Sequence, residues 1–162
     1  MESKVIYTVG HSSLPLTAFC RLITDFGITC IVDVRRFPSS KRHPQFNKSH
    51  VRNVLQQHGI IYQWLEALGG FRREGYVNYM NSEQFTQALL QLESYAESTK
   101  TAIMCAELSP LHCHRYHVPD ALVGRGWRIH HLGGYTGLIE HHEQMVMGQG
   151  EGIADRRTSI DA

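Results

Sequence analysis

The chain has 162 residues, 42% of them hydrophobic, and a formal net charge of +1 at pH 7. This length is typical of a single domain with its own hydrophobic core, and so small a net charge excludes an overall electrostatic attraction to nucleic acid or to a membrane surface. Because no apolar run approaches the ~20 residues of a membrane span, we predict a soluble protein without a membrane partner.

Along most of the chain, segments with the apolar pattern of a strand alternate with segments whose apolar residues have the spacing of a helix. In chain order, this pattern predicts a strand at 4–10, a helix at 15–27, a strand at 28–34, a helix at 48–59, a strand at 60–65, a helix at 81–98, a strand at 101–107, a helix at 118–126, a strand at 127–132 and a helix at 137–147. Asn81 and Gln84 have the spacing of a capping box at the start of the longest helix.

Strands that alternate with helices predict an α/β fold, because right-handed crossovers between parallel strands place the helices on both faces of the sheet. We expect a single three-layer domain over residues 1–147, with a mainly parallel five-stranded sheet in the Rossmann-like order 3-2-1-4-5. Residues 148–162 are rich in glycine and polar residues and predict a flexible tail. The four cysteines form no CxxC pair and no secretory signal opens the chain, which favours a reduced, cytoplasmic protein.

Polar residues gather where three of the predicted strands end. These three clusters are Gly10, His11 and Ser12 after the first strand, Asp33, Arg35 and Arg36 after the second, and residues 105–115 after the fourth. Ligands of such folds bind beyond the carboxyl ends of the strands. Because the three strands are neighbours in the predicted order, the clusters are expected to meet in one pocket.

Each of the first two clusters allows a functional and a structural interpretation. Free backbone amides at the first turn would favour an anion, and His11 would be able to move a proton. The alternative is that Ser12 or Ser13 caps the following helix. A carboxylate in an apolar strand is costly unless it is paired. Asp33 is therefore either a catalytic group or the structural partner of Arg35 or Arg36.

The stretch 35–52 is the most basic part of the chain, with six Lys or Arg residues and no Asp or Glu. Phe37 and Phe46 lie among these cations, an arrangement that suits a phosphate backbone with a stacked base. The alternative is a solvated loop with surface charges.

The third cluster carries Glu107, Cys113, His114 and Arg115. Cys105 and Glu107 are alternate residues and should face the same side of the sheet, where Glu107 would serve as a general acid or base, a nucleophile or an anchor for Arg115. A helix that begins near Cys113 would lower the pKa of its thiol. The phosphatase or rhodanese cradle is excluded by spacing, because Arg115 follows Cys113 by only two positions.

A metal site is another interpretation of this segment. It would draw on thiolate, carboxylate and imidazole ligands from Cys105, Glu107, His112, Cys113, His114 and His117. No pair of them has CxxC or HExxH spacing, so neither a metal ion nor a cofactor is expected.

Several motifs in these segments together resemble the family described as domain of unknown function 488. They are TVGHSS, IVDVRRFPSS with PQFNK, LGGFRR, YMNSEQF, MCAE and CHR, in this order from Thr8 to about Leu132. The resemblance implies a compact α/β domain, and members are often labelled as DNA-repair proteins without a firm reaction. The family's motif residues would correspond to Gly10, His11, Ser12, Asp33, Arg35, Pro38, Glu107, Pro110, Cys113, His114 and Arg115.

The clusters predict an enzyme, a hydrolase or a transferase, that acts on a phosphate-bearing nucleotide or nucleic acid. The residues expected to bind the anion are Gly10, Ser12, Arg35, Arg36 and Arg115. The residues expected to carry the reaction are Asp33 or Glu107 as the carboxylate, His11 or His114 as the proton carrier, and Cys113 as an alternative nucleophile. A non-catalytic nucleic-acid or nucleotide-binding module that uses the same arginines and a metal-binding protein are the alternatives.

Overall fold

A six-stranded sheet forms the centre of the structure, a computed structural model that describes residues 4–12, 14–39, 41–69, 75–106, 117–133 and 137–140. In chain order, the elements are β1 (Val5–Gly10), α1 (Leu16–Asp25), β2 (Cys30–Asp33), η1 (Pro44–Phe46), α2 (Lys48–Gln57), β3 (Ile61–Trp64), η2 (Glu66–Leu68), α3 (Tyr76–Tyr79), α4 (Glu83–Ser98), β4 (Thr101–Cys105), α5 (His117–Gly124), β5 (Arg128–Gly133) and β6 (Gly137–Glu140).

The strands lie in the order β3-β2-β4-β1-β5-β6, and all neighbouring pairs are parallel except β5 and β6. The predicted α/β class with a mainly parallel sheet is therefore confirmed. The predicted order 3-2-1-4-5 is wrong, because β4 lies between β1 and β2. Alternation along the sequence determines the direction of the strands but leaves their order open. β4 is buried at all five of its positions, which is typical of a central parallel strand.

The last predicted helix, at 137–147, is wrong over its first four residues, which form β6. This segment pairs antiparallel with β5, with Leu132 opposite Leu138 and His130 opposite Glu140. Pairing with a neighbouring strand thus overrides the helical spacing of the apolar residues. Residues 141–147 and the tail predicted over 148–162 lie outside the described part of the chain.

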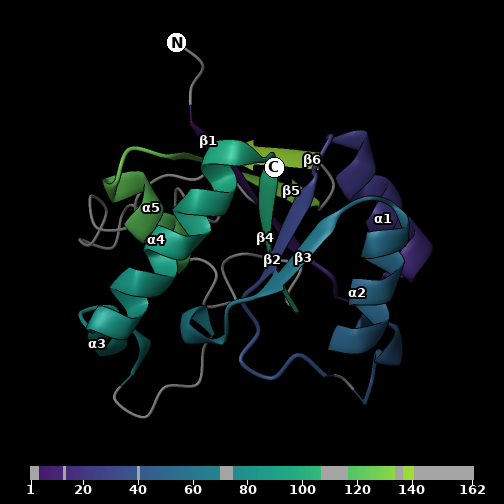
Figure 1. Cartoon of the computed structure of the whole chain (residues 1–162), viewed down its shortest axis with the longest axis horizontal. Helices are drawn as coiled ribbons and strands as arrows, with labels where there is room; N and C mark the ends of the chain where they lie inside the picture. Colours follow the sequence, from purple (N-terminus) through teal and green to yellow (C-terminus); the bar gives the residue numbers. More distant parts are fainter. Residues whose placement is uncertain are drawn as a thin grey trace.

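Helices cover both faces of the sheet, as predicted. Figure 1 shows α1 and α2 on one side and α3, α4 and α5 on the other. On the α1/α2 side, helical residues that include Phe19, Ile23, Val51 and Leu55 form a core cluster with Val9, Ile31 and Met104. On the α4/α5 side, the corresponding residues include Phe85, Leu89, Leu92 and Leu122, with Ile6, Val32 and Ile103 from the sheet.

The helix predicted over 81–98 is present as α4 and buries the expected apolar stripe. Its cap differs from the prediction. Ser82 is the N-cap, and its hydroxyl accepts a hydrogen bond from the Phe85 backbone N–H at 3.2 Å, whereas the sequence favoured Asn81. Within the described residues, no helix is both long enough and apolar enough to cross a membrane.

Candidate functional site

The ends of β1, β2 and β4 are neighbours at the carboxyl edge of the sheet, the lower edge in Figure 1, with β4 in the middle. The His11 backbone N–H donates to the Cys105 carbonyl at 2.9 Å, and the Ser12 N–H donates to the Ala106 carbonyl at 2.8 Å. The first turn is therefore bound to the chain just where it leaves β4. Only Cys105 and Ala106 of the third cluster are described, and its members Glu107, Cys113, His114 and Arg115 lie outside the described residues.

These hydrogen bonds correct one sequence expectation. The amides of His11 and Ser12 are engaged by β4, so they are not free to bind an anion. Ser12 is also not the cap of α1, because that helix begins at Leu16 and its N-cap residue is Pro15. Ser12 instead adopts a φ of 46°, a left-handed conformation that is uncommon for a residue other than glycine and that is found often at functional sites.

Asp33 and Arg35 form a buried, bidentate ion pair. Arg35 Nε donates to Asp33 Oδ1 at 2.9 Å, and Arg35 Nη2 donates to Oδ2 at 2.7 Å. The Arg35 backbone N–H adds a bond to Oδ1 at 3.0 Å, and the Tyr62 hydroxyl donates to Oδ2. Asp33 is fully buried and Arg35 is 5% exposed. The geometry thus matches the structural alternative for Asp33, with Arg35 rather than Arg36 as the partner.

Arg35 also links the second cluster to the first. Its Nη1 donates to the Phe46 carbonyl at 2.7 Å and lies 3.4 Å from His11 Nε2, which accepts. Burial lowers the pKa of the guanidinium, but the hydrogen bonds and charge of Asp33 outweigh burial and raise it. A guanidinium has five N–H groups. The Tyr62 side chain also interacts with the guanidinium, so the Arg35 donors are directed into the buried cluster.

His11 is a buried, neutral imidazole in a fixed orientation. Its Nδ1 donates to the Ser12 carbonyl at 2.8 Å, and its ring stacks on Phe46 with the centroids 4.2 Å apart. Burial lowers the pKa of His11 to about 4, and the charge of Arg35 acts in the same direction. At neutral pH, His11 therefore carries no proton on Nε2, and it orients Arg35 rather than supplying a proton.

Tyr62, on β3, completes the buried cluster and was not singled out by the sequence. Burial and the neighbouring Asp33 carboxylate raise the pKa of its hydroxyl well above the usual range, so the hydroxyl remains a donor. We expect Tyr62→Phe to lower the free energy of unfolding by about 1.5 kcal/mol, because a hydrogen bond to a charged group is lost. Urea denaturation measures this change. In the matched variant Tyr7→Phe the change should stay below about 0.5 kcal/mol, and equal losses in the two variants would refute the role of the hydroxyl.

Beside the buried cluster, cations and aromatic rings form an accessible rim, defined by Arg36, Phe37, Lys48 and Trp64. Phe37 is 64% exposed, and the Arg36 guanidinium lies 5.7 Å from its ring centroid. Lys48 Nζ lies 4.3 Å from the Trp64 ring centroid, and Trp64 Nε1 donates to the Arg35 carbonyl at 2.7 Å. The rim is thus connected to the buried cluster through Trp64.

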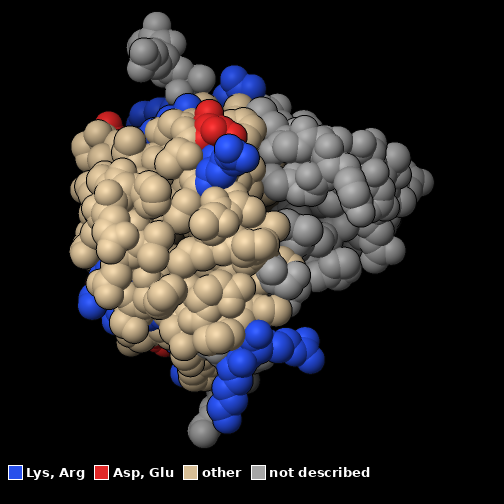
Figure 2. Space-filling view, turned by 90° about the vertical axis from the view of Figure 1, so that its right-hand side faces the viewer, with Lys and Arg blue, Asp and Glu red and all other residues tan. Residues whose placement is uncertain are grey.

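Two observations describe the surroundings of the rim. A Cβ on Gly69 would lie 2.6 Å from Arg36 Cα, so the LGG motif allows η2 to approach the loop after β2 closely. Figure 2 shows the α1/α2 side, where Lys and Arg lie at both the upper and the lower margins while most of the face is uncharged.

A second buried polar pair lies on the opposite face of the sheet and was also missed. Thr8 Oγ1 and His131 Nδ1 are hydrogen-bonded at 2.5 Å, and both residues are almost fully buried. Ile6 and Ile129, two positions earlier on the same strands, belong to the α4/α5 core, so Thr8 and His131 face that side. The only sequence signal for the pair is a polar residue at an inward position of each strand.

The described residues contain no group of three His, Cys, Asp or Glu side chains that would hold a metal ion. Of the ligands suggested by the sequence, only Cys105 and His117 are described. Cys105 is buried, and the His117 ring stacks on Tyr76 with the centroids 5.5 Å apart.

In the comparison with protein families, the model described as domain of unknown function DUF488 matches residues 15–122. Comparison with curated proteins and with solved structures gives no match. The matched range includes the clusters after β2 and β4, whereas Gly10, His11 and Ser12 lie just before it.

Proposed function

Because the chain belongs to the DUF488 family, whose description names no reaction, its function has to be argued from its own residues, and we propose that it is a hydrolase or a transferase. The substrate is a nucleotide or nucleic acid that presents a phosphate at the carboxyl edge of the sheet. The site is built around the buried cluster of Asp33, Arg35, Tyr62 and His11.

One observation carries this proposal: a buried ion pair stands at the carboxyl edge, next to an accessible rim of cations and aromatic rings. A buried ion pair is often no more stabilising than apolar residues of similar volume, so stability alone does not explain it. The carboxyl edge is where parallel α/β sheets bind ligands. Arg36 and Arg115 would contact the phosphate oxygens, and Arg35 would add its positive charge from the buried cluster.

Hydrogen bonding within the cluster divides the proposed roles. The Asp33 carboxylate already accepts four hydrogen bonds, so Asp33 positions Arg35 and leaves the catalytic carboxylate to Glu107. Because the pKa of His11 is held at about 4, His114 is the proton carrier. Cys113 remains the alternative nucleophile. Gly10 and Ser12 would lie against the substrate through close backbone approach rather than through free amides.

The test combines binding and turnover. Nucleoside monophosphates and short single-stranded oligonucleotides are titrated into the full chain while the indole N–H signal of Trp64, which bonds to Arg35, is followed by NMR. Products are followed by ³¹P NMR. We expect Glu107→Gln to retain binding and lose turnover, and Arg36→Gln to weaken binding about tenfold. Arg21→Gln, an exposed change on α1, is the matched control.

Turnover that survives in Glu107→Gln overturns the catalytic assignment. Binding that is unaffected by Arg36→Gln but lost in Arg21→Gln places the substrate elsewhere and overturns the site.

A specific observation favours a second candidate, a non-catalytic nucleic-acid-binding module. Phe37 is exposed beside Arg36, and the basic stretch continues through the exposed residues Lys41, Arg42 and Arg52. Such a surface suits base stacking next to a phosphate backbone. In that case no substrate is turned over, and the logarithm of affinity falls linearly with the logarithm of salt concentration. Phe37→Ala would then weaken binding while leaving the fold intact.

A further inference from the structure

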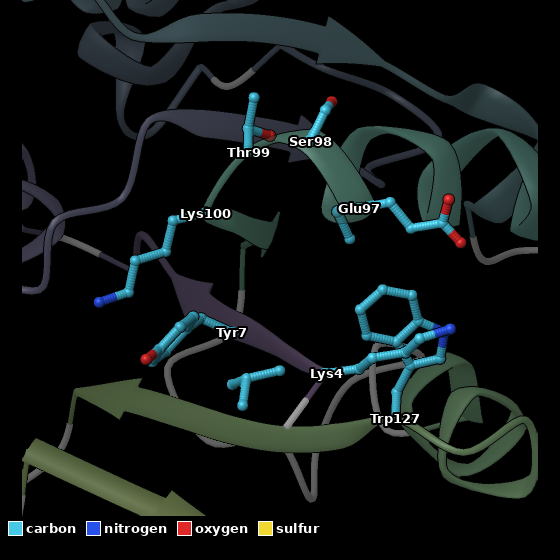
Figure 3. Close-up of a pocket in the computed structure, with 9 residues that line it drawn as sticks. Lys4, Tyr7, Glu97, Ser98, Thr99, Lys100 and Trp127 are labelled. Carbon is cyan, nitrogen blue, oxygen red and sulfur yellow. The ribbon is translucent and has the colours of Figure 1, made fainter. Parts of the chain in front are cut away.

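A cavity of about 690 Å³ lies at the amino edge of the sheet, the end opposite the site described above. Its walls come from the end of α4, the start of β1 and the residue that precedes β5 (Figure 3). Small-molecule sites have volumes of about 300–1,000 Å³, so this cavity is large enough for a ligand of one or two rings.

Two ammonium groups, those of Lys4 and Lys100, line this cavity. Lys4 Nζ lies 5.4 Å from the Trp127 ring centroid, and Lys100 Nζ lies 5.1 Å from the Tyr7 ring centroid. Among the described residues, no carboxylate forms a salt bridge with either lysine. In Figure 3 the Glu97 carboxylate, the acidic group of the lining, points away from Lys100. The cavity therefore presents two cations that a ligand can engage.

Glu93, an acidic residue that bonds to Trp127 of the lining, is already occupied. Glu93 accepts from Arg125 Nη2 at 2.8 Å and from Trp127 Nε1 at 2.7 Å. Burial raises the pKa of Glu93, but the hydrogen bonds from Arg125 and Trp127 and the charges of Arg125 and Lys4 lower it. Lys4 thus attracts Glu93 at longer range than Arg125 does, and an incoming acidic group would compete for the charge of Lys4.

The remaining wall is apolar and partly flat. Val5, Ala96 and the half-buried ring of Tyr7 contribute to it, and Trp127 closes one end. A lysine that rests on an aromatic ring at the surface is held only weakly, so it can turn toward an anion and uncover the ring. Tyr7 then offers a stacking surface next to two cations.

We propose that this cavity binds a small aromatic anion, a flat ring that carries a carboxylate or a phosphate. The ring lies on Tyr7, and the acidic group lies between Lys4 and Lys100. The competing explanation is that the two lysines only complement the negative, C-terminal end of α4. This site is independent of the proposed function at the carboxyl edge.

The two tryptophans allow a direct test, because Trp127 reports on the amino edge and Trp64 on the carboxyl edge. The full chain, labelled with ¹⁵N, is titrated with 4-hydroxybenzoate, phenyl phosphate and inorganic phosphate, and the two indole signals are assigned with Trp64→Phe. We expect saturable shifts of the Trp127 signal with one or both aromatic probes, and the stronger probe identifies the acidic group. Inorganic phosphate should bind at least about tenfold more weakly, since it lacks the ring.

Variants complete the test. Lys4→Gln with Lys100→Gln should weaken aromatic binding at least about tenfold, whereas Lys48→Gln at the other edge should leave it unchanged. Both lysines of the double variant are exposed, so the fold is retained. The proposal is overturned if no probe gives a saturable Trp127 shift, if the double variant binds as well as the wild type, or if inorganic phosphate binds equally well. A shift of Trp64 alone also overturns it, and that result would support the carboxyl-edge site instead.

Discussion

Replacement of Asp33 by asparagine is expected to lower the free energy of unfolding by about 3–5 kcal/mol, because the change leaves the Arg35 guanidinium buried without its counter-charge. Arg35 is 5% exposed and bonds to both carboxylate oxygens of Asp33, so water cannot replace the lost partner. Urea denaturation followed by circular dichroism measures the loss. Among the variants considered, this one should be the most damaging to stability.

Glu66→Gln provides the matched control, because Glu66 forms an ion pair with Arg36 in which the closest N···O distance is 3.7 Å and both side chains are partly exposed. That change should cost less than about 1 kcal/mol. If Asp33→Asn does not fold, a second variant still tests the pair. Asp33→Leu combined with Arg35→Met removes both charges and should lower the free energy of unfolding by less than Asp33→Asn alone. Similar losses for Asp33→Asn and Glu66→Gln would contradict the role assigned to the buried pair.

The class of the fold follows from the sequence because each element is encoded locally. The apolar run at residues 28–34 is typical of a buried strand, and the apolar stripe at 81–98 has the spacing of a helix. Both elements are present, as β2 and α4. The order of the strands depends on contacts between distant segments. β4 pairs with both β1 and β2, with Ala102 next to Tyr7 on one side and Ile31 on the other. No local sequence pattern predicts which strands become neighbours.

The candidate site shows the same division. The sequence predicts that residues after β1 and β2 come together, and the contact between His11 and Arg35 confirms it. It could not rank the two interpretations of Asp33, because the answer depends on Tyr62, which reaches Asp33 across neighbouring strands. Tyr62 stands in an apolar run, where an aromatic residue is ordinary. Only the pairing of β2 with β3 gives it a polar function.

The stability of the wild-type protein is expected to fall by about 3 kcal/mol more than that of His11→Gln between pH 6.5 and pH 4. In the unfolded chain, His11 has the ordinary pKa of 6.5, whereas burial lowers its pKa to about 4 in the folded protein. Between these values the unfolded state binds a proton that the folded state does not. The contribution is therefore complete above pH 6.5 and is lost as the pH falls toward 4.

The contact with Arg35 is a second reason why the pKa of His11 is lowered in the folded protein. A protonated His11 would place its new N–H against Arg35 Nη1, which now donates to Nε2 at 3.4 Å, so two donors and two positive charges would face each other. The measurement is the free energy of unfolding against pH for the wild type and for His11→Gln. All the other histidines are common to both proteins, so the difference between the two curves isolates His11. Its slope should approach about 1.4 kcal/mol per pH unit between the two pKa values. Parallel curves would show that His11 accepts a proton as readily in the folded protein as in the unfolded chain, and the buried cluster would then not be the dry, charge-paired unit from which the site is built.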